Sequence, residues 1–243
     1  MSTMSNDKRA TKPGHSTSPL SRRTLIALTA LCIVSLLGHI ALLPHMPEMI
    51  PTHWDAAGTV DGWTGRTAIV ALDALPLLFL FMFHIIPRID PRGQAYERMG
   101  LFYTGFVILF TIFIVAMTWT SELTVFGILP ESGSPIGAAT SIAVGVGLIL
   151  LGNYMPKIKR NYTFGVKTPW ALDDDDNWRL THRFCGIAYV LAGIAVVGAG
   201  ALSLQHGEIA FWVLMAAVLG AGIVTYLYSF LVYRNGNRPL RTR

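Results

Sequence analysis

The chain has 243 residues, of which 52% are hydrophobic and 14% are charged, and its formal net charge is +5. This composition, arranged as long stretches without charges, excludes an ordinary soluble globular domain. Its two cysteines have no motif spacing, which argues against a disulfide framework or a zinc finger.

Six apolar stretches are each close to the roughly 20 residues that a helix needs to cross a bilayer. They cover residues 24–43, 68–86, 101–119, 136–155, 186–204 and 209–232. Continuous apolar runs differ from the short alternating strands of a membrane barrel. The pattern therefore predicts an all-α, polytopic integral membrane protein with six transmembrane helices, for which membrane lipid is the first expected partner.

The positive charges alternate from one side of these stretches to the other. Of the 19 Lys and Arg residues, all except Arg66 lie before the first stretch, after the second, after the fourth or after the sixth. Because loops rich in Lys and Arg face the cytoplasm, both termini are predicted to be inside. The net positive charge then reflects membrane topology, and no direct contact with nucleic acid is expected.

Residues 1–23 are rich in Ser, Thr, Lys and Pro and contain few apolar side chains. Such a segment cannot offset the entropy lost on ordering, so a disordered cytoplasmic tail is predicted there. A second cytoplasmic tail is predicted over residues 234–243.

The loop between the first two stretches, residues 44–67, is predicted to face outside and to form a small ordered lid. Asp61 and Gly62, flanked by Val60 and Trp63, form a hairpin-turn pattern because Asp and Gly tolerate positive φ. The same loop holds two imidazoles and two carboxylates that could bind zinc, namely His45, Glu48, His53 and Asp55. Their spacing matches no metalloprotease motif, so they are expected to order the loop and to form hydrogen bonds at the membrane interface, and no metal or other cofactor is expected.

Two ionisable residues lie inside predicted membrane helices. At about 1.5 Å of rise per residue, His39 and Asp73 both lie roughly 6 to 9 Å from the outer ends of their helices, so they can pair. Ionisable groups at such depths are costly and usually face protein or water. A structural hydrogen-bonded pair is the plainer interpretation, and a proton-linked or ligand-gating role is the alternative. Pro76, one turn beyond Asp73, is expected to interrupt the helix.

The second long loop, residues 156–185, is predicted to be cytoplasmic. The run from Asp173 to Asp176 is placed to cap a helix and to favour its positive end, and this helix is expected to continue into the fifth stretch. Small residues allow close helix approach in membranes. The last two stretches hold glycines suited to this role, namely Gly193, Gly198, Gly200, Gly220 and Gly222.

Motifs in both loops resemble those of known families. The sequence PTHWDAAGTVDG at residues 51–62 is similar to the external segment of a widespread bacterial membrane domain of uncharacterised function. The sequences GNYMP at 152–156, GVKTPWAL at 165–172 and WRLTHR at 178–183 resemble the signature of SdpI-type immunity proteins.

The resemblance divides the chain into an N-terminal membrane domain, residues 24–119, and an SdpI-like membrane domain, residues 136–233. It implies a bacterial plasma-membrane protein that gives resistance to a secreted antimicrobial peptide toxin. It further implies that such a protein can sense the toxin and hold a transcriptional repressor at the membrane. The toxin-facing candidates are in the external loop, namely His53, Trp54, Asp55, Gly58, Asp61 and Gly62. The candidates for contact with a cytoplasmic partner are Asn153, Asn161, Lys167, Pro169, Trp170, Trp178, Arg179, His182 and Arg183.

Two other classes of function remain open. His39, Asp73 and His84 lie in or near membrane helices, as in a small proton-coupled transporter or a channel-like membrane protein. A membrane hydrolase could use the external histidines, but the chain has no recognisable nucleophile motif, HExxH sequence or phosphate-binding loop. A protein that is not an enzyme is therefore expected.

Overall fold

A computed structural model describes residues 19–132, 135–203 and 208–240 of the chain. The prediction of a disordered N-terminal tail concerns residues that lie mostly outside these ranges. The elements, in chain order, are α1 (Arg22–Leu42), the 3₁₀ turn η1 (Leu43–His45), β1 (Met49–Trp54), β2 (Val60–Gly65), α2 (Ile69–Asp73), α3 (Leu75–Ile89), α4 (Gln94–Thr118), α5 (Thr120–Val125), α6 (Pro135–Tyr154), the 3₁₀ turn η2 (Met155–Lys157), α7 (Pro169–Asp173), α8 (Asp175–Leu202) and α9 (Ile209–Arg234).

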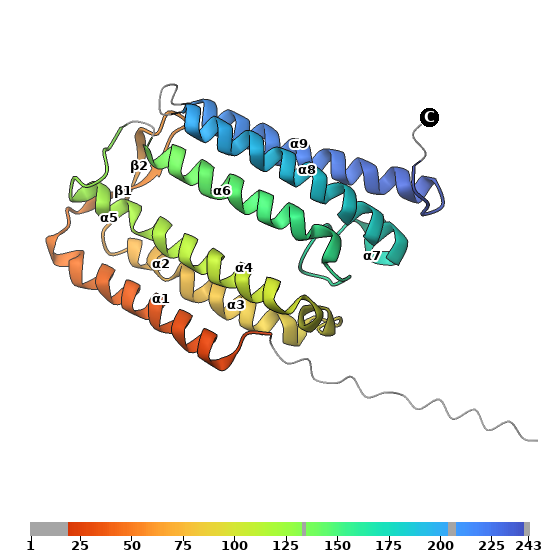
Figure 1. The fold of residues 1–243 in the computed structure, drawn as a ribbon. Helices are drawn as coiled ribbons and strands as arrows, with labels where there is room; N and C mark the ends of the chain where they lie inside the picture. The colour runs from red at the N-terminus through yellow and green to blue at the C-terminus, as the bar shows by residue number, and fades with distance from the viewer. Residues whose placement is uncertain (1–18, 133–134, 204–207, 241–243) are drawn as a thin grey trace, which may run out of the picture.

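Six helical segments are long and apolar enough to cross a membrane, and each overlaps one of the six stretches predicted from the sequence. The six helices agree with the prediction of an all-α membrane protein, and the described residues of the loop after α1 add a two-stranded antiparallel sheet of β1 and β2. Figure 1 shows this hairpin at one end of the helix bundle and α7 at the other. We call these ends the hairpin end and the α7 end.

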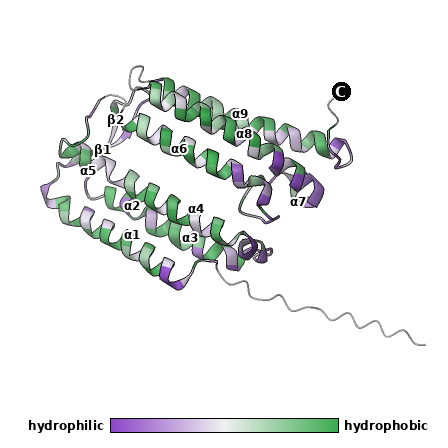
Figure 2. Cartoon of the chain, viewed as in Figure 1, coloured by the Kyte–Doolittle hydropathy of each residue, from purple (hydrophilic) through white to green (hydrophobic). Residues whose placement is uncertain are grey.

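The two ends differ in polarity. Figure 2 shows hydrophilic residues gathered at the α7 end, around α7 and the start of α8, while the middles of the long helices are mostly hydrophobic. The predicted cytoplasmic loops therefore share one end of the bundle. That the α7 end faces the cytoplasm stays a prediction from the charge distribution.

The spans form two groups, with α1, α3 and α4 in one and α6, α8 and α9 in the other (Figure 1). In the second group, glycines bring α6 and α8 into close contact. A Cβ atom added at Gly193 would lie 2.5 Å from the carbonyl oxygen of Gly145, and one added at Gly152 would lie 2.7 Å from that of Gly186. These helices can approach this closely only because side chains are absent from the contact.

The predicted role of glycines in helix packing is confirmed only in part. Gly200 also faces α6, since an added Cβ atom would lie 2.8 Å from a side-chain carbon of Ile142. At Gly198, Gly220 and Gly222 an added Cβ atom would meet no described atom within 4 Å, so the prediction is wrong for these three.

The second and third spans are both interrupted. Pro76 lies in the first turn of α3, where its missing N–H separates this helix from α2, as predicted. Gly100 breaks α4 with a φ of +41°, a conformation that favours glycine. The third span also extends beyond Trp119, where the sequence predicted its end, because α5 follows at once and carries Glu122 into the interior.

At the α7 end, the segment between α6 and α7 joins the two groups of helices. The ring of Phe164 packs edge-on against that of Phe106 in α4, with centroids 4.9 Å apart. Next to this segment, the hydroxyl of Tyr154, the last residue of α6, donates a hydrogen bond to the carbonyl of Met99, at 3.1 Å. As predicted, an aspartate caps α8, because the Asp174 side chain accepts a hydrogen bond from the backbone N–H of Asn177. The helix α8 then continues into the fifth span.

Candidate functional site

The hairpin end carries the sequence PTHWD, of which residues 51–54 lie on β1 and Asp55 begins the turn. His53 pairs with Gly62 across the sheet, and the imidazole bonds to the carboxylate of Asp61. The predicted ordered lid is therefore a β-hairpin. The predicted turn at Asp61 and Gly62 is wrong, because both residues lie within β2.

The turn itself lies between Asp55 and Thr59. The Asp55 carboxylate accepts hydrogen bonds from the backbone N–H groups of Ala57, at 2.9 Å, and of Thr59, at 2.8 Å. Gly58 supplies the positive φ, +78°, that closes the turn. Asp55 and Gly58 thus fix the conformation of the turn that joins β1 to β2.

A cavity of about 310 Å³ lies between the hairpin and the ends of three spans. The hairpin contributes Thr52, His53, Trp54, Asp55, Ala56 and Gly58. The helices contribute Met117, Thr120, Ile136, Gly137, Thr140, Ser141, Phe211 and Leu214. Four of the six toxin-facing candidates therefore line the cavity, and Asp61 and Gly62 lie outside it. Its apolar walls with a few hydroxyl groups are typical of a ligand pocket, and its volume is at the low end of their range.

The external residues considered for zinc do not converge. His53 is 71% exposed at its side chain and pairs with Asp61, which is 48% exposed, rather than with Asp55. Within the described ranges, His45, Glu48, His53 and Asp55 form no group whose ligand atoms come together.

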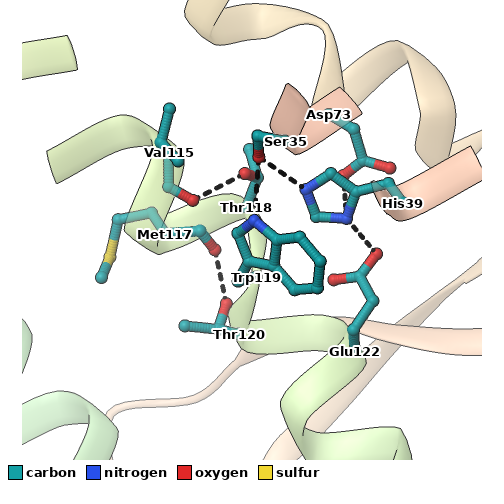
Figure 3. Close-up of polar contacts among 9 residues, drawn as sticks. All are labelled: Ser35, His39, Asp73, Val115, Met117, Thr118, Trp119, Thr120 and Glu122. Atoms are coloured by element: carbon teal, nitrogen blue, oxygen red, sulfur yellow. Dashed lines mark hydrogen bonds and ion pairs between the residues drawn. The ribbon is translucent and has the colours of Figure 1, made fainter. Parts of the chain in front are cut away.

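A different polar cluster lies below the hairpin, inside the bundle (Figure 3). His39 of α1 and Asp73 of α2 come together as predicted, with His39 Nδ1 3.8 Å from Asp73 Oδ1. A closer partner is Glu122 of α5, whose Oε1 lies 2.7 Å from His39 Nδ1. All three side chains are buried, and we call this group the His39 cluster.

The His39 ring is held from its other side. Its Nε2 lies 3.4 Å from the hydroxyl of Ser35, which also accepts a hydrogen bond from the indole N–H of Trp119, at 2.8 Å. The Trp119 ring lies against the imidazole, with centroids 4.3 Å apart. These contacts turn Nδ1 toward the two carboxylates, as Figure 3 shows.

The α7 end is ordered by Asn161, which is fully buried. Its amide donates to the carbonyls of Lys159, at 2.8 Å, and of Phe164, at 2.9 Å, and its oxygen accepts from the hydroxyl of Tyr96, at 3.1 Å. The single proton of this hydroxyl is shared with Asp90, whose Oδ2 atom lies 2.7 Å from the hydroxyl oxygen. Asn161 thus connects the loop to α4 and its preceding turn.

Two further predicted partner contacts, Trp178 and His182, are also buried. The Trp178 indole donates to the carbonyl of Ile158, and His182 accepts from the backbone N–H of Val166 through Nε2. A side chain at Gly165 would collide with His182, because its Cβ atom would lie 2.4 Å from Nε2. The prediction of direct partner contact is therefore wrong for Asn161, Trp178 and His182, whose side chains hold the loop in place.

The remaining partner candidates lie nearer the surface. Trp170 is half-buried and packs against Tyr226 and Phe230 of α9. The exposed ones are Asn153, Lys167, Pro169, Arg179 and Arg183. Of these, Arg179 pairs with Asp176 one turn away on α8, at 2.9 Å.

Comparison with known proteins finds similarities in two parts of the chain. Residues 157–229 match the SdpI/YfhL protein family. Residues 30–80, which include the hairpin, His39 and Asp73, match a domain of unknown function, DUF1648. The resemblance predicted from the sequence is thereby confirmed.

The chain is also similar to a characterised protein along most of its length. It is 24% identical over 221 residues to "Immunity protein SdpI" of Bacillus subtilis (strain 168), a match that covers 89% of this chain and 100% of that protein. No solved structure matches the chain. With its six apolar helices, the chain is a multi-pass bacterial membrane protein.

Glu122 and Asn177 are buried polar residues that the sequence pattern does not indicate. Glu122 follows the third apolar stretch, where a carboxylate is expected at the water interface. Asn177 is buried at the start of α8 and bonds through its amide to Ser229 and Asn237 and through its oxygen to Thr181. The absence of other charged residues between Arg98 and Glu131 was the one signal that Glu122 could lie inside.

Proposed function

We propose that this protein is a plasma-membrane immunity protein that gives resistance to a secreted antimicrobial peptide toxin and does not catalyse a reaction. The observation that carries the proposal is the similarity, over 89% of the chain, to a protein named as an immunity protein. The match to the SdpI/YfhL protein family supports the same conclusion. The predicted orientation, with both termini inside, puts the hairpin end outside the cell, where a secreted peptide arrives.

The cavity beneath the hairpin supplies a contact surface for such a peptide. Its volume of about 310 Å³ suits one or two side chains rather than a whole peptide. Met117, Phe211 and Leu214 can receive an apolar side chain, while Thr140 and Ser141 can bond to a polar backbone. An amphipathic peptide at the membrane surface offers both kinds of group.

The orientation can be tested by labelling. In a chain whose two buried cysteines, Cys32 and Cys185, are replaced by alanine, a single cysteine is placed at Thr59 or at Thr163, both of which are exposed. An impermeant thiol reagent is expected to label the first variant in intact cells and the second only after lysis. Labelling of the Thr163→Cys variant in intact cells would reverse the orientation and remove the hairpin from the toxin's side.

Protection can be tested with Trp54→Ala in a toxin-sensitive bacterium. The cells are challenged with a panel of secreted antimicrobial peptides, and a peptide resisted by cells with the wild-type protein is chosen. Because Trp54 lines the cavity and large aromatic contacts dominate binding, survival is expected to fall at least about tenfold. Membrane abundance, measured by immunoblot, is expected to stay unchanged.

Trp63→Ala is the matched control, since Trp63 lies on the same hairpin, is 54% exposed and does not line the cavity. Its survival is expected to equal that of the wild type. Equal loss of survival in both variants would assign the effect to the hairpin as a scaffold. Protection against no peptide in the panel would count against immunity itself.

We further propose that the α7 end carries the sensing function by binding a cytoplasmic repressor. Lys167, Arg179 and Arg183 are exposed there, and such charged groups suit the rim of a protein interface. The two ends then act separately. In the same survival assay, Arg183→Glu is expected to leave protection intact. A loss of protection in this variant would show that the two ends are not independent.

A further inference from the structure

The His39 cluster has more hydrogen-bond acceptors than donors. Both carboxylate oxygens of Asp73 and the Oε2 atom of Glu122 are buried and have no hydrogen-bond partner among the described residues. One protonated imidazole balances the charge of one carboxylate. The second carboxylate, inside the bundle and away from water, then needs a proton or a cation.

The geometry of the three side chains is close to that of a metal site. One ligand atom from each of His39, Asp73 and Glu122 lies within 4.8 Å of the others. In a tetrahedral zinc site the ligands lie about 2.0 to 2.2 Å from the ion, which puts neighbouring ligands roughly 3.3 to 3.6 Å apart. The two contacts of His39 Nδ1, at 2.7 and 3.8 Å, bracket that spacing, so small side-chain rotations suffice to form the site.

We propose that His39, Asp73 and Glu122 bind one divalent transition-metal ion, with zinc as the ion that best fits one imidazole nitrogen and two carboxylate oxygens. Three protein ligands leave a fourth position for water. The charges balance as well, because a divalent cation neutralises both carboxylates while the imidazole stays neutral. This inference does not depend on the proposed immunity function.

The surroundings of His39 fit a metal ligand. A coordinating imidazole usually donates its other N–H group to an oxygen, which fixes the ring and its tautomer. Here Nε2 faces the hydroxyl of Ser35, and Trp119 donates to the same oxygen and covers the ring. With Nε2 protonated, the lone pair of Nδ1 points toward the carboxylates.

A metal here would tie together three helices that support the hairpin. The ligands come from α1, α2 and α5, whose ends meet at this point. The neighbouring apolar cluster contains Met46, Ile50 of β1 and Ile69 of α2. Because Asp73 lies one turn after Ile69, a bound ion would hold the base on which the hairpin rests.

The test measures zinc in the full-length protein, purified in detergent with a tag that contains no histidine. After treatment with a chelator and dialysis against micromolar zinc, mass spectrometry of the metal content is expected to find about one zinc per chain. Zinc is also expected to raise the thermal unfolding temperature in a concentration-dependent way, because it binds the folded state. Cobalt in its place is expected to give the visible absorption of a four-coordinate ion.

The variants Asp73→Asn and Glu122→Gln keep the side-chain size and each remove one ligand. Their zinc affinity is expected to fall by more than the roughly 100-fold that loss of an outer-shell partner costs. Asp61→Asn is the matched control, since it alters the exposed His53 pair and is expected to leave the zinc content unchanged. If the wild-type protein keeps no zinc above the level of its buffer, or if the control loses zinc as the cluster variants do, the proposal is wrong, and a proton shared by the carboxylates takes its place.

Discussion

Gly193→Ala is expected to separate α6 from α8 and to destabilise the protein strongly. The new Cβ atom would lie 2.5 Å from the carbonyl oxygen of Gly145 and 2.9 Å from the backbone nitrogen of Ile149. Both atoms belong to a helix backbone and cannot move aside as a flexible side chain can. Overpacking of this kind costs about 1 to 3 kcal/mol or more. The measurement is the thermal unfolding temperature of the variant in detergent.

Gly198→Ala makes the same chemical change on the same helix and serves as the control. No described atom lies within 4 Å of its added Cβ atom. Because alanine has a higher helix propensity than glycine, by about 0.8 to 1.0 kcal/mol, this variant is expected to be as stable as the wild type or slightly more stable. The two substitutions should therefore act in opposite directions, and a similar loss in both would argue against glycine-mediated packing of α6 on α8.

The membrane helices could be predicted because the bilayer imposes strict requirements on sequence. A spanning segment must satisfy its backbone hydrogen bonds internally and must match the hydrocarbon thickness, so length and hydropathy identify it. The breaks within the spans were harder to predict. Pro76 predicts a break in its helix because proline has no backbone N–H, whereas nothing in the sequence distinguishes Gly100 from the glycines that stay helical.

The hairpin illustrates why a local pattern can predict an element and misplace its turn. Two segments of this loop, one starting at Asp55 and one at Asp61, combine aspartate with glycine. Both residue types tolerate positive φ, so either segment could form the turn. The structure uses the first, because the Asp55 carboxylate bonds to two backbone N–H groups while Asp61 pairs with His53. Tertiary pairing of this kind is not visible in the spacing of residues.

The candidate sites also depend on contacts that the spacing of residues does not reveal. His39 and Asp73 could be paired from depth alone, because both lie inside apolar stretches. Glu122 joins them only because α5 continues the third span beyond Trp119 and places its carboxylate beside His39, an effect of tertiary packing. Asn161, by contrast, lies in a motif that suggested a surface contact, yet its side chain satisfies the backbone of its own loop.

Asn161→Asp is expected to disrupt the loop at the α7 end, although the two side chains have the same shape. The amide donates to the carbonyls of Lys159 and Phe164, and a carboxylate would direct an oxygen at both instead. It would also share the Tyr96 hydroxyl with the carboxylate of Asp90, so two like charges would meet in a buried place. Each buried group left unsatisfied costs about 1 to 3 kcal/mol, so a total loss of roughly 2 to 5 kcal/mol is expected.

Thermal unfolding and limited proteolysis of residues 157–168 together measure this effect, because the loop is expected to open before the helices separate. Asn153→Asp introduces the same charge on an exposed position of α6, where the side chain bonds only to the carbonyl of Ile149 among the described residues, and it is expected to change stability by less than about 0.5 kcal/mol. If Asn161→Asp unfolds like the wild type and its loop resists protease equally, the hydrogen bonds of Asn161 do not hold the loop between the two groups of helices. The residue would then return to the set of possible partner contacts, together with Lys167 and Arg183.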